Sequence, residues 1–252
     1  MFSDRIRGSI KVMALAGAAM AMPFAATAGV IVKSSGPSAS QYPVGQQIDD
    51  DASITLRAGD RITVLTDDGT RVMQGPGEFR VGEGATRTRA RFSSLTRQRA
   101  ARRVRTGAVR GAEMGATRKP NLWFVDVTAP GTMCLIDLDA IRLWRPESQL
   151  AQTYSIVDPS SENGLDVTFV ETEAVRALDP EVIAIDEGSE YRILAPAMEG
   201  ENAKRPSISV RFVTLDEEGD YSTPARLAAA LYENGCTTQL ALLADTLETS
   251  AL

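Results

Sequence analysis

Short runs in which apolar and polar residues alternate constrain the fold of this chain most strongly. Residues 53–57 and 61–66 alternate in this way, and each run is followed by a turn signal. The Asp-Asp-Gly hairpin signal at 67–69 and the Gly-Pro-Gly turn at 75–77 separate further short strands. Because alternate residues of a strand point to opposite faces, each run offers one apolar face for burial. The pattern predicts an antiparallel β meander over residues 52–82.

The second half of the chain repeats this pattern. Strands are expected at residues 122–127, 132–136, 141–144, 153–157, 165–170, 182–185, 191–194 and 207–215. Their spacing predicts a second antiparallel β unit, a sandwich or an open barrel, over residues 121–221. We expect the large rings of Trp123, Phe124 and Trp144 in its core or at a sheet edge rather than in a sugar-stacking site.

Residues 222–252 carry the signals of a helical pair. Thr223, or the serine before it, suits the cap of a first helix, and Pro224 suits its first position. Gly235 is placed to end that helix, and a second helix follows to about residue 247. We therefore expect a mainly β protein, with two small antiparallel β units and a C-terminal helical hairpin.

The predicted meander also resembles a known family. The strings ITLRAGDRITVL at 54–65, DGTRV at 68–72 and GPGEFRV at 75–81 resemble a FecR-type β-domain, and GAVRG at 107–111 resembles the Gly-x-Val-Arg-Gly element of such domains. FecR-type domains occur in bacterial envelope proteins, including regulators that pass signals from the periplasm to membrane sigma-factor systems. The resemblance implies a FecR-like β fold over residues 50–111, with interruptions, and a role in the envelope. It supplies no catalytic residues.

The N-terminal residues have the order of a secretory signal. Three basic residues precede an apolar run over residues 12–22, and the small residues Ala-Thr-Ala close it at 26–28. The run is shorter than the ~20 residues that span a bilayer. We expect cleavage after Ala28 and export to the periplasm, or, as the alternative, an uncleaved segment that anchors the protein in the inner membrane. Residues 29–51 are rich in Gly, Pro, Ser and Gln and are expected to form a linker, apart from a short strand at 30–32.

The chain has two cysteines, Cys134 and Cys236. In an oxidising compartment such a pair predicts a disulfide bond, with two separate buried thiols as the alternative. The bond would close a loop of about 100 residues, for which the chain-entropy estimate is ~4–5 kcal/mol of stabilisation.

The sequence contains no histidine. Histidine is the general base of Ser-His-Asp and Cys-His sites and the usual zinc ligand, so these catalytic classes are excluded and neither a metal nor a cofactor is predicted. Only carboxylate chemistry stays open, because glycosidases require two placed Asp or Glu residues. The leading expectation is therefore an exported, non-catalytic binding, sensing or scaffolding protein. The alternative is a histidine-free hydrolase that acts on envelope glycan.

Residues 80–119, here called the basic segment, hold twelve basic and two acidic residues. We expect residues 83–120 to form an arginine-rich connector with a short helix over 94–105. The candidate anion-binding residues are Arg97, Arg99, Arg102, Arg103 and Arg105.

The expected targets of the basic segment are acidic lipid headgroups at a membrane surface, surface polysaccharide or an acidic protein. Two alternatives are a solvated loop, and docking of the segment against residues 147–220 of the same chain, which hold seventeen acidic and five basic residues. Nucleic acid is not expected as a partner, because the chain is predicted to be exported and Phe92 is the single aromatic residue of the segment.

Overall fold

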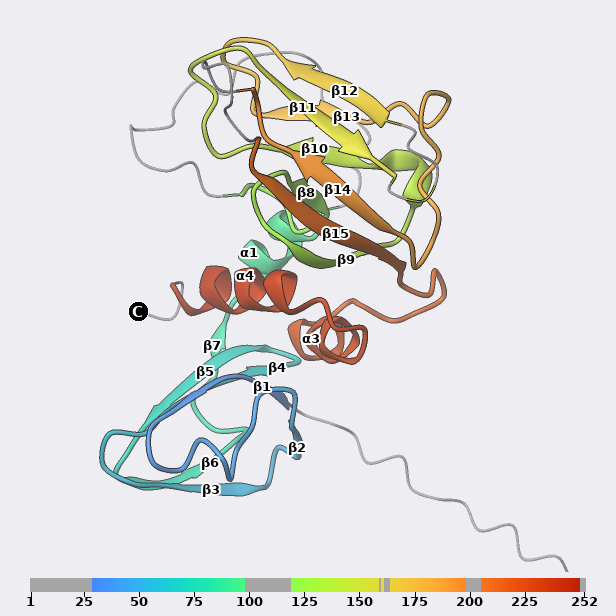
Figure 1. The fold of residues 1–252 in the computed structure, drawn as a ribbon. Helices are drawn as coiled ribbons and strands as arrows, with labels where there is room; N and C mark the ends of the chain where they lie inside the picture. The colour runs from blue at the N-terminus through green and yellow to red at the C-terminus, as the bar shows by residue number, and fades with distance from the viewer. Residues whose placement is uncertain (1–28, 98–118, 159, 161–163, 198–204, 250–252) are drawn as a thin grey trace, which may run out of the picture.

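The computed structural model describes residues 29–97, 119–158, 160, 164–197 and 205–249. Two β units lie at opposite ends of this part of the molecule, and the C-terminal pair of helices lies between them (Figure 1). The prediction of a mainly β fold with antiparallel sheets and a C-terminal helical pair is confirmed. The predicted signal segment, residues 1–28, lies outside the described residues.

The first β unit consists of a five-stranded and a two-stranded antiparallel sheet. The larger sheet contains, in spatial order, β2 (Gln47–Ile48), β1 (Gly29–Ser35), β4 (Arg61–Thr66), β5 (Gly69–Gln74) and β7 (Thr86–Arg87). The smaller sheet pairs β3 (Ser53–Leu56) with β6 (Gly77–Arg80). Ile31, Ile54, Ile62, Val64 and Met73 are buried together between the sheets, as the alternating pattern requires.

Residues 29–51 are part of this unit, which corrects the expectation of a linker. β1 pairs with β4 from Gly29 opposite Thr66 to Ser35 opposite Arg61. The loop after β1 is also held in place, because the carboxylate of Asp60 accepts a hydrogen bond from the Ser38 amide at 2.8 Å. The glycine- and proline-rich composition of this region therefore makes a packed turn rather than a spacer.

The second β unit contains a three-stranded and a five-stranded sheet. The three-stranded sheet has the order β13 (Val175–Ala177), β10 (Arg142–Trp144), β8 (Phe124–Asp126). The five-stranded sheet has the order β12 (Gly164–Phe169), β11 (Gln152–Val157), β14 (Glu190–Leu194), β15 (Ser207–Thr214), β9 (Gly131–Leu135). A 3-10 turn, η1 (Leu138–Ala140), lies between β9 and β10. All pairings are antiparallel except β8 with β10 and β9 with β15, which are parallel.

The core of the second unit includes the rings that the sequence placed there. Trp123, Phe124 and Trp144 are all buried. The same interior also holds a charged side chain, Arg145, which is completely buried and donates hydrogen bonds to the backbone oxygens of Glu173, Leu150 and Val170. A buried arginine is tolerated when its donors are satisfied in this way, and here it joins two loops to the end of β10.

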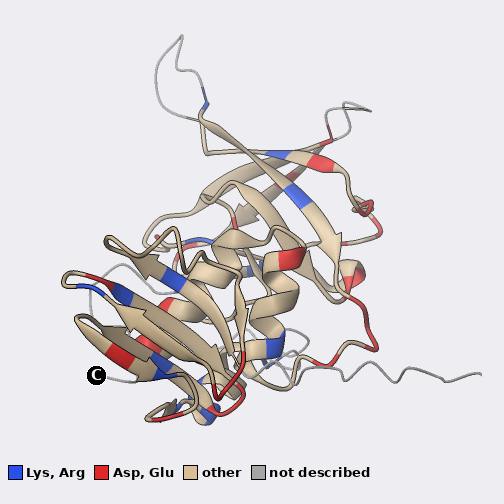
Figure 2. Cartoon of the chain, turned by 90° about the horizontal axis from the view of Figure 1, so that it is seen from below, with Lys and Arg blue, Asp and Glu red and all other residues tan. Residues whose placement is uncertain are grey.

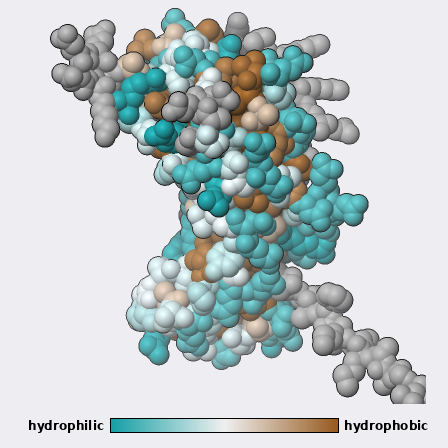
Figure 3. Space-filling view, turned by 45° about the vertical axis from the view of Figure 1, so that its right-hand side comes forward, coloured by the Kyte–Doolittle hydropathy of each residue, from teal (hydrophilic) through white to brown (hydrophobic). Residues whose placement is uncertain are grey.

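Helices α3 (Pro224–Glu233) and α4 (Thr237–Glu248) form the C-terminal pair, as predicted. Thr223 caps α3 by accepting a hydrogen bond from the Arg226 amide, and Gly235 ends it with a φ of 72°, a conformation that glycine adopts without strain. The apolar side chains of both helices join the core of the second unit, and both helices also contact strands β1 and β4 of the first. Figure 3 shows that the molecule is narrow between the two β units, where these helices lie.

Helix α1 (Arg89–Leu95) begins earlier than the expected helix over 94–105 and ends at Leu95. Its position follows from Phe92 and Leu95, which are both buried. Among the residues that the structure describes, none of the helices has the length and apolar composition that crossing a membrane requires.

Candidate anion-binding surface

The described part of the basic segment presents four exposed arginines close together in the chain. Arg87 lies on β7, Arg89 and Arg91 lie on α1, and Arg97 follows the end of α1. We call these four residues the basic surface. Of the five candidates named from the sequence, only Arg97 is described, and Arg99, Arg102, Arg103 and Arg105 lie outside the described residues.

The packing of α1 exposes Arg89 and Arg91. Phe92 and Leu95 face the interior, where α1 contacts α4, and the polar residues around them face solvent. The Thr88 carbonyl accepts the first helical hydrogen bond from the Phe92 amide at 2.9 Å, so the helix begins directly after β7. Two apolar residues three positions apart therefore determine which side chains of the run are exposed.

The end of α1 is fixed to the chain that enters β8. The carbonyls of Leu95, Thr96 and Arg97 accept hydrogen bonds from the Leu122 amide at 3.0 Å, the indole of Trp123 at 2.8 Å and the side-chain amide of Asn121 at 3.1 Å, respectively. Residues 97 and 121 are therefore neighbours in space.

Several other cations among the residues that the structure describes have an acidic partner. Lys33, Arg61, Arg176 and Arg226 each form an ion pair. No residue of the basic surface forms an ion pair with a carboxylate among the residues that the structure describes. Their guanidinium groups are thus free to donate to an external anion.

Lys119, the last residue of the basic segment, lines a small pocket beside Asp126, Gly131, Thr238 and Gln239. Burial lowers the pKa of this lysine to about 8, although the nearby Asp126 carboxylate acts to raise it. The pocket volume is about 20 Å³, which is room for about one water molecule. Lys119 therefore does not line a cavity for an organic ligand.

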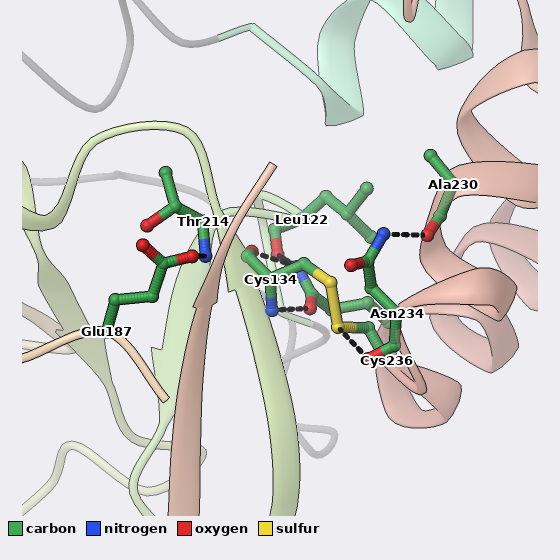
Figure 4. The surroundings of a disulfide bond; sticks show 8 residues. Leu122, Cys134, Glu187, Thr214, Ala230, Asn234 and Cys236 are labelled. Atoms are coloured by element: carbon green, nitrogen blue, oxygen red, sulfur yellow. Dashed lines mark hydrogen bonds between the residues drawn. A yellow bond between two sulfur atoms is a disulfide. The ribbon is translucent and has the colours of Figure 1, made fainter. Parts of the chain in front are cut away.

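The predicted disulfide between Cys134 and Cys236 is present (Figure 4). Both cysteines are fully buried, and the bond joins strand β9 to the start of α4.

Beside the disulfide lies Gln239, which sequence reasoning missed. Its side-chain amide accepts from the Cys134 amide at 2.7 Å and donates to the carbonyls of Cys134 at 2.9 Å and Leu122 at 3.2 Å. Gln239 thereby occupies the free edge of β9 in the way that another strand would. The sequence feature that could have pointed to Gln239 is a polar residue directly beside the apolar positions of α4.

Two buried acids of the described residues, Asp60 and Glu248, can be compared with what a carboxylate hydrolase requires. That chemistry requires two facing acids, one of them with a raised pKa. For Asp60, burial acts to raise the pKa, but hydrogen bonds from Ser38 and Arg57 hold it below its usual value. Glu248 shows the same balance, and the bonds from Lys33 and Arg61 lower its pKa. Figure 2 shows the acidic residues in red on several loops and strands rather than gathered at one place.

Comparisons with known proteins find no match for this chain. No family model, no curated protein and no solved structure matches it. Any ligand of the basic surface therefore has to be inferred from the chemistry of its own residues.

Proposed function

We propose that the protein is an exported, non-catalytic binding module of the bacterial envelope, and that its basic segment binds an anionic component of that envelope. The observation that carries this proposal is the set of four exposed arginines, Arg87, Arg89, Arg91 and Arg97, which have no described acidic partner. Arginine binds phosphate and carboxylate groups through two parallel hydrogen bonds. Phosphate-bearing lipid headgroups and acidic surface polysaccharide both match this chemistry, and an acidic protein is the further candidate.

We also propose that the first β unit is a FecR-like domain with a sensing or scaffolding role. In support, the turns at residues 58–60, 67–69 and 75–77, which carry the resemblance, lie between strands of that unit. Under this proposal β7 and α1 continue the domain, so that the basic surface is displayed at the end of it that adjoins the helical pair.

Retention on vesicles tests the proposal. We expect the exported protein to be retained on phosphatidylglycerol vesicles and not on phosphatidylcholine vesicles, and we expect retention to fall as salt rises from about 50 to 300 mM, because salt screens exposed charges. Replacing Arg87, Arg89 and Arg91 together by Gln should remove most of the retention. An acidic polysaccharide in solution should compete if both ligands use the same surface.

A charge-matched control separates local contact from net charge. Arg57, Arg176 and Arg226 are exposed residues outside the basic surface, and their replacement by Gln changes the net charge by the same amount. Retention should survive in this control. Equal loss in both triple variants, or no loss in the first, would remove the basic surface from the function of the protein.

A further inference from the structure

The five-stranded sheet of the second β unit has one face in the core and one face toward solvent. The strand register places the following side chains on the solvent side, which we call the outer face: Ser155, Asp166, Thr168, Arg192, Ser209 and Arg211. All of them are exposed except Ser155. The aromatic residues of the same strands lie on the opposite side, in the core. The outer face is therefore rich in hydroxyl and guanidinium groups and offers no ring on which a neutral sugar could stack.

The charge of the outer face is opposite to that of the surrounding sequence. Residues 147–220 hold seventeen acidic and five basic residues. Among the residues of this range that the structure describes, Arg192, Arg205 and Arg211 lie on or against the outer face, together with the acids Asp166 and Glu190. The cations of an acidic region thus gather on one side of one sheet.

Arg205 is held in position by the protein itself. Its Nε donates to the Ala195 carbonyl at 2.7 Å, and one Nη donates to the Ser155 hydroxyl at 3.1 Å. The Ser155 hydroxyl in turn donates to the Asp166 carboxylate at 2.5 Å. These bonds fix the plane of the guanidinium and use only part of its five donors.

Two of the three arginines lack a described acidic partner. Arg211 lies 3.9 Å from Glu190, whereas Arg192 and Arg205 form no ion pair within the described ranges. Arg192 lies diagonally from Ser155 on the next strand, since Val157 is opposite Arg192 and Ser155 is opposite Leu194. Diagonal neighbours of this kind are about 7–8 Å apart, so one extended ligand can reach both arginines.

The mixture of groups identifies the ligand class. Arginines bind carboxylates, while the Asp166 carboxylate accepts hydrogen bonds and repels a purely anionic surface such as a layer of phosphates. A chain of uronic acids supplies both kinds of partner, because its carboxylates accept from Arg192 and Arg205 and its hydroxyls donate to Asp166. We infer that the outer face is a second binding surface, separate from the basic surface, and that its ligand is a carboxylated polysaccharide.

Calorimetric titration with a hexamer of galacturonic acid tests this inference. The titration is done on the protein in which Arg87, Arg89, Arg91 and Arg97 are Gln, so that none of the four arginines of the basic surface contributes. We expect the hexamer to bind this protein, and a neutral glucose hexamer to bind at least about tenfold more weakly, because it cannot form charge-assisted hydrogen bonds. Arg192→Gln or Arg205→Gln, added to this protein, should each weaken the acidic hexamer about tenfold.

The matched control is Arg176→Gln, which removes an exposed arginine of the same unit that lies on β13 and pairs with Glu173. It should leave the affinity unchanged. Arg192 is exposed, so its variant decides the matter even if Arg205→Gln impairs folding. No binding of the acidic hexamer, equal binding of the neutral one, or an equal loss in Arg176→Gln would overturn the inference. None of these outcomes changes the vesicle experiment, which tests the other surface.

Discussion

The helical pair is attached to the two β units by different chemistry. Toward the second unit, the start of α4 is held by the disulfide of Cys236 and by the three hydrogen bonds of Gln239, all of them buried. Toward the first unit, the end of α4 is held by ion pairs at the rim of a small apolar contact. One end of the same helix is therefore fixed covalently, and the other is not.

The contact with the first unit combines ionic and apolar parts. The Glu248 carboxylate lies 2.5 Å from both the Lys33 ammonium and the Arg61 guanidinium, and Asp245 also pairs with Lys33. Val30, Val32 and Leu65 of the first unit share one buried cluster with the helices. Ion pairs whose cations are partly exposed weaken with salt and pH, whereas a buried disulfide responds to neither. The helices and the second unit should thus behave as one body, to which the first unit is joined less firmly.

Of the changes to the two attachments, removal of the disulfide should lower the free energy of unfolding most. The bond spans a sequence separation of 102 residues, and replacing Cys134 and Cys236 by Ala should lower the free energy of unfolding by about 4–5 kcal/mol in the chain-entropy estimate. Urea unfolding followed by circular dichroism measures this loss, with reduction of the unchanged protein in urea as the matched control. A loss below about 1 kcal/mol would show that the disulfide does not make the attachment of the helices to the second unit firmer than their attachment to the first.

The buried amide of Gln239 gives the next largest expected effect. Gln239→Leu leaves the Cys134 amide and the carbonyls of Cys134 and Leu122 without their partner, and such orphaned buried groups cost about 2–3 kcal/mol. The control is Thr237→Leu, an exposed position on the same turn, which should change the free energy of unfolding by less than about 0.5 kcal/mol. Equal effects at the two positions would mean that the edge of β9 does not need Gln239.

The pH dependence of the stabilisation by Glu248 tests the contact between α4 and the first unit. Its burial acts to raise its pKa, but the hydrogen bonds of Lys33 and Arg61 outweigh burial and lower it below 4.5. The folded state therefore releases this proton more readily than the unfolded state does, so the stabilisation is complete above pH 4.5 and is lost as the pH falls through the lowered pKa. For Lys33, burial acts to lower the pKa, but its two carboxylate partners raise it above 10.5, and its contribution is lost only as the pH rises through that raised value.

Glu248→Gln should accordingly lower the free energy of unfolding by about 1–2 kcal/mol near pH 7, a value kept small because Lys33 and Arg61 are partly exposed. The difference between variant and unchanged protein should shrink as the pH falls below 4.5. Unfolding measured between about pH 3 and 8 checks this. A difference that is independent of pH would show that packing, rather than charge, joins α4 to the first unit.

Local signals explain which parts of the fold could be predicted from the sequence. The turn at 67–69, the cap at Thr223 and the end of α3 at Gly235 depend on neighbouring residues only, and each could be placed without the structure. The disulfide could be predicted because there are just two cysteines and the compartment was inferred from the N-terminal residues. The two parallel strand pairings could not be predicted, because short runs of alternating residues do not specify the direction of their partner.

Contacts between distant parts of the chain account for what was missed. Lys33 and Glu248 are 215 residues apart, and Cys134 and Gln239 are 105 apart, so no local pattern connects them. For the candidate site, the sequence indicated residues 97–105, of which the structure describes only Arg97, whereas the described arginines of the basic surface also include Arg87, Arg89 and Arg91. Arg89 and Arg91 lie close to Phe92 in the helix. Their exposure could be predicted only if Phe92 were already known to be buried where α1 contacts α4.

The smallest expected effect concerns the arginines of the basic surface. Replacing Arg87, Arg89 and Arg91 by Gln should change the free energy of unfolding by less than about 0.5 kcal/mol, because these side chains are exposed and have no described ion-pair partner. Arg61→Gln, which removes one partner of Glu248, is the matched contrast and should cost about 1 kcal/mol. Urea unfolding of both variants at pH 7 makes the comparison. A loss above about 1 kcal/mol in the triple variant would place the basic surface among the contacts that hold the two units together, and a loss of vesicle retention in that variant would then reflect a damaged fold rather than a missing binding site.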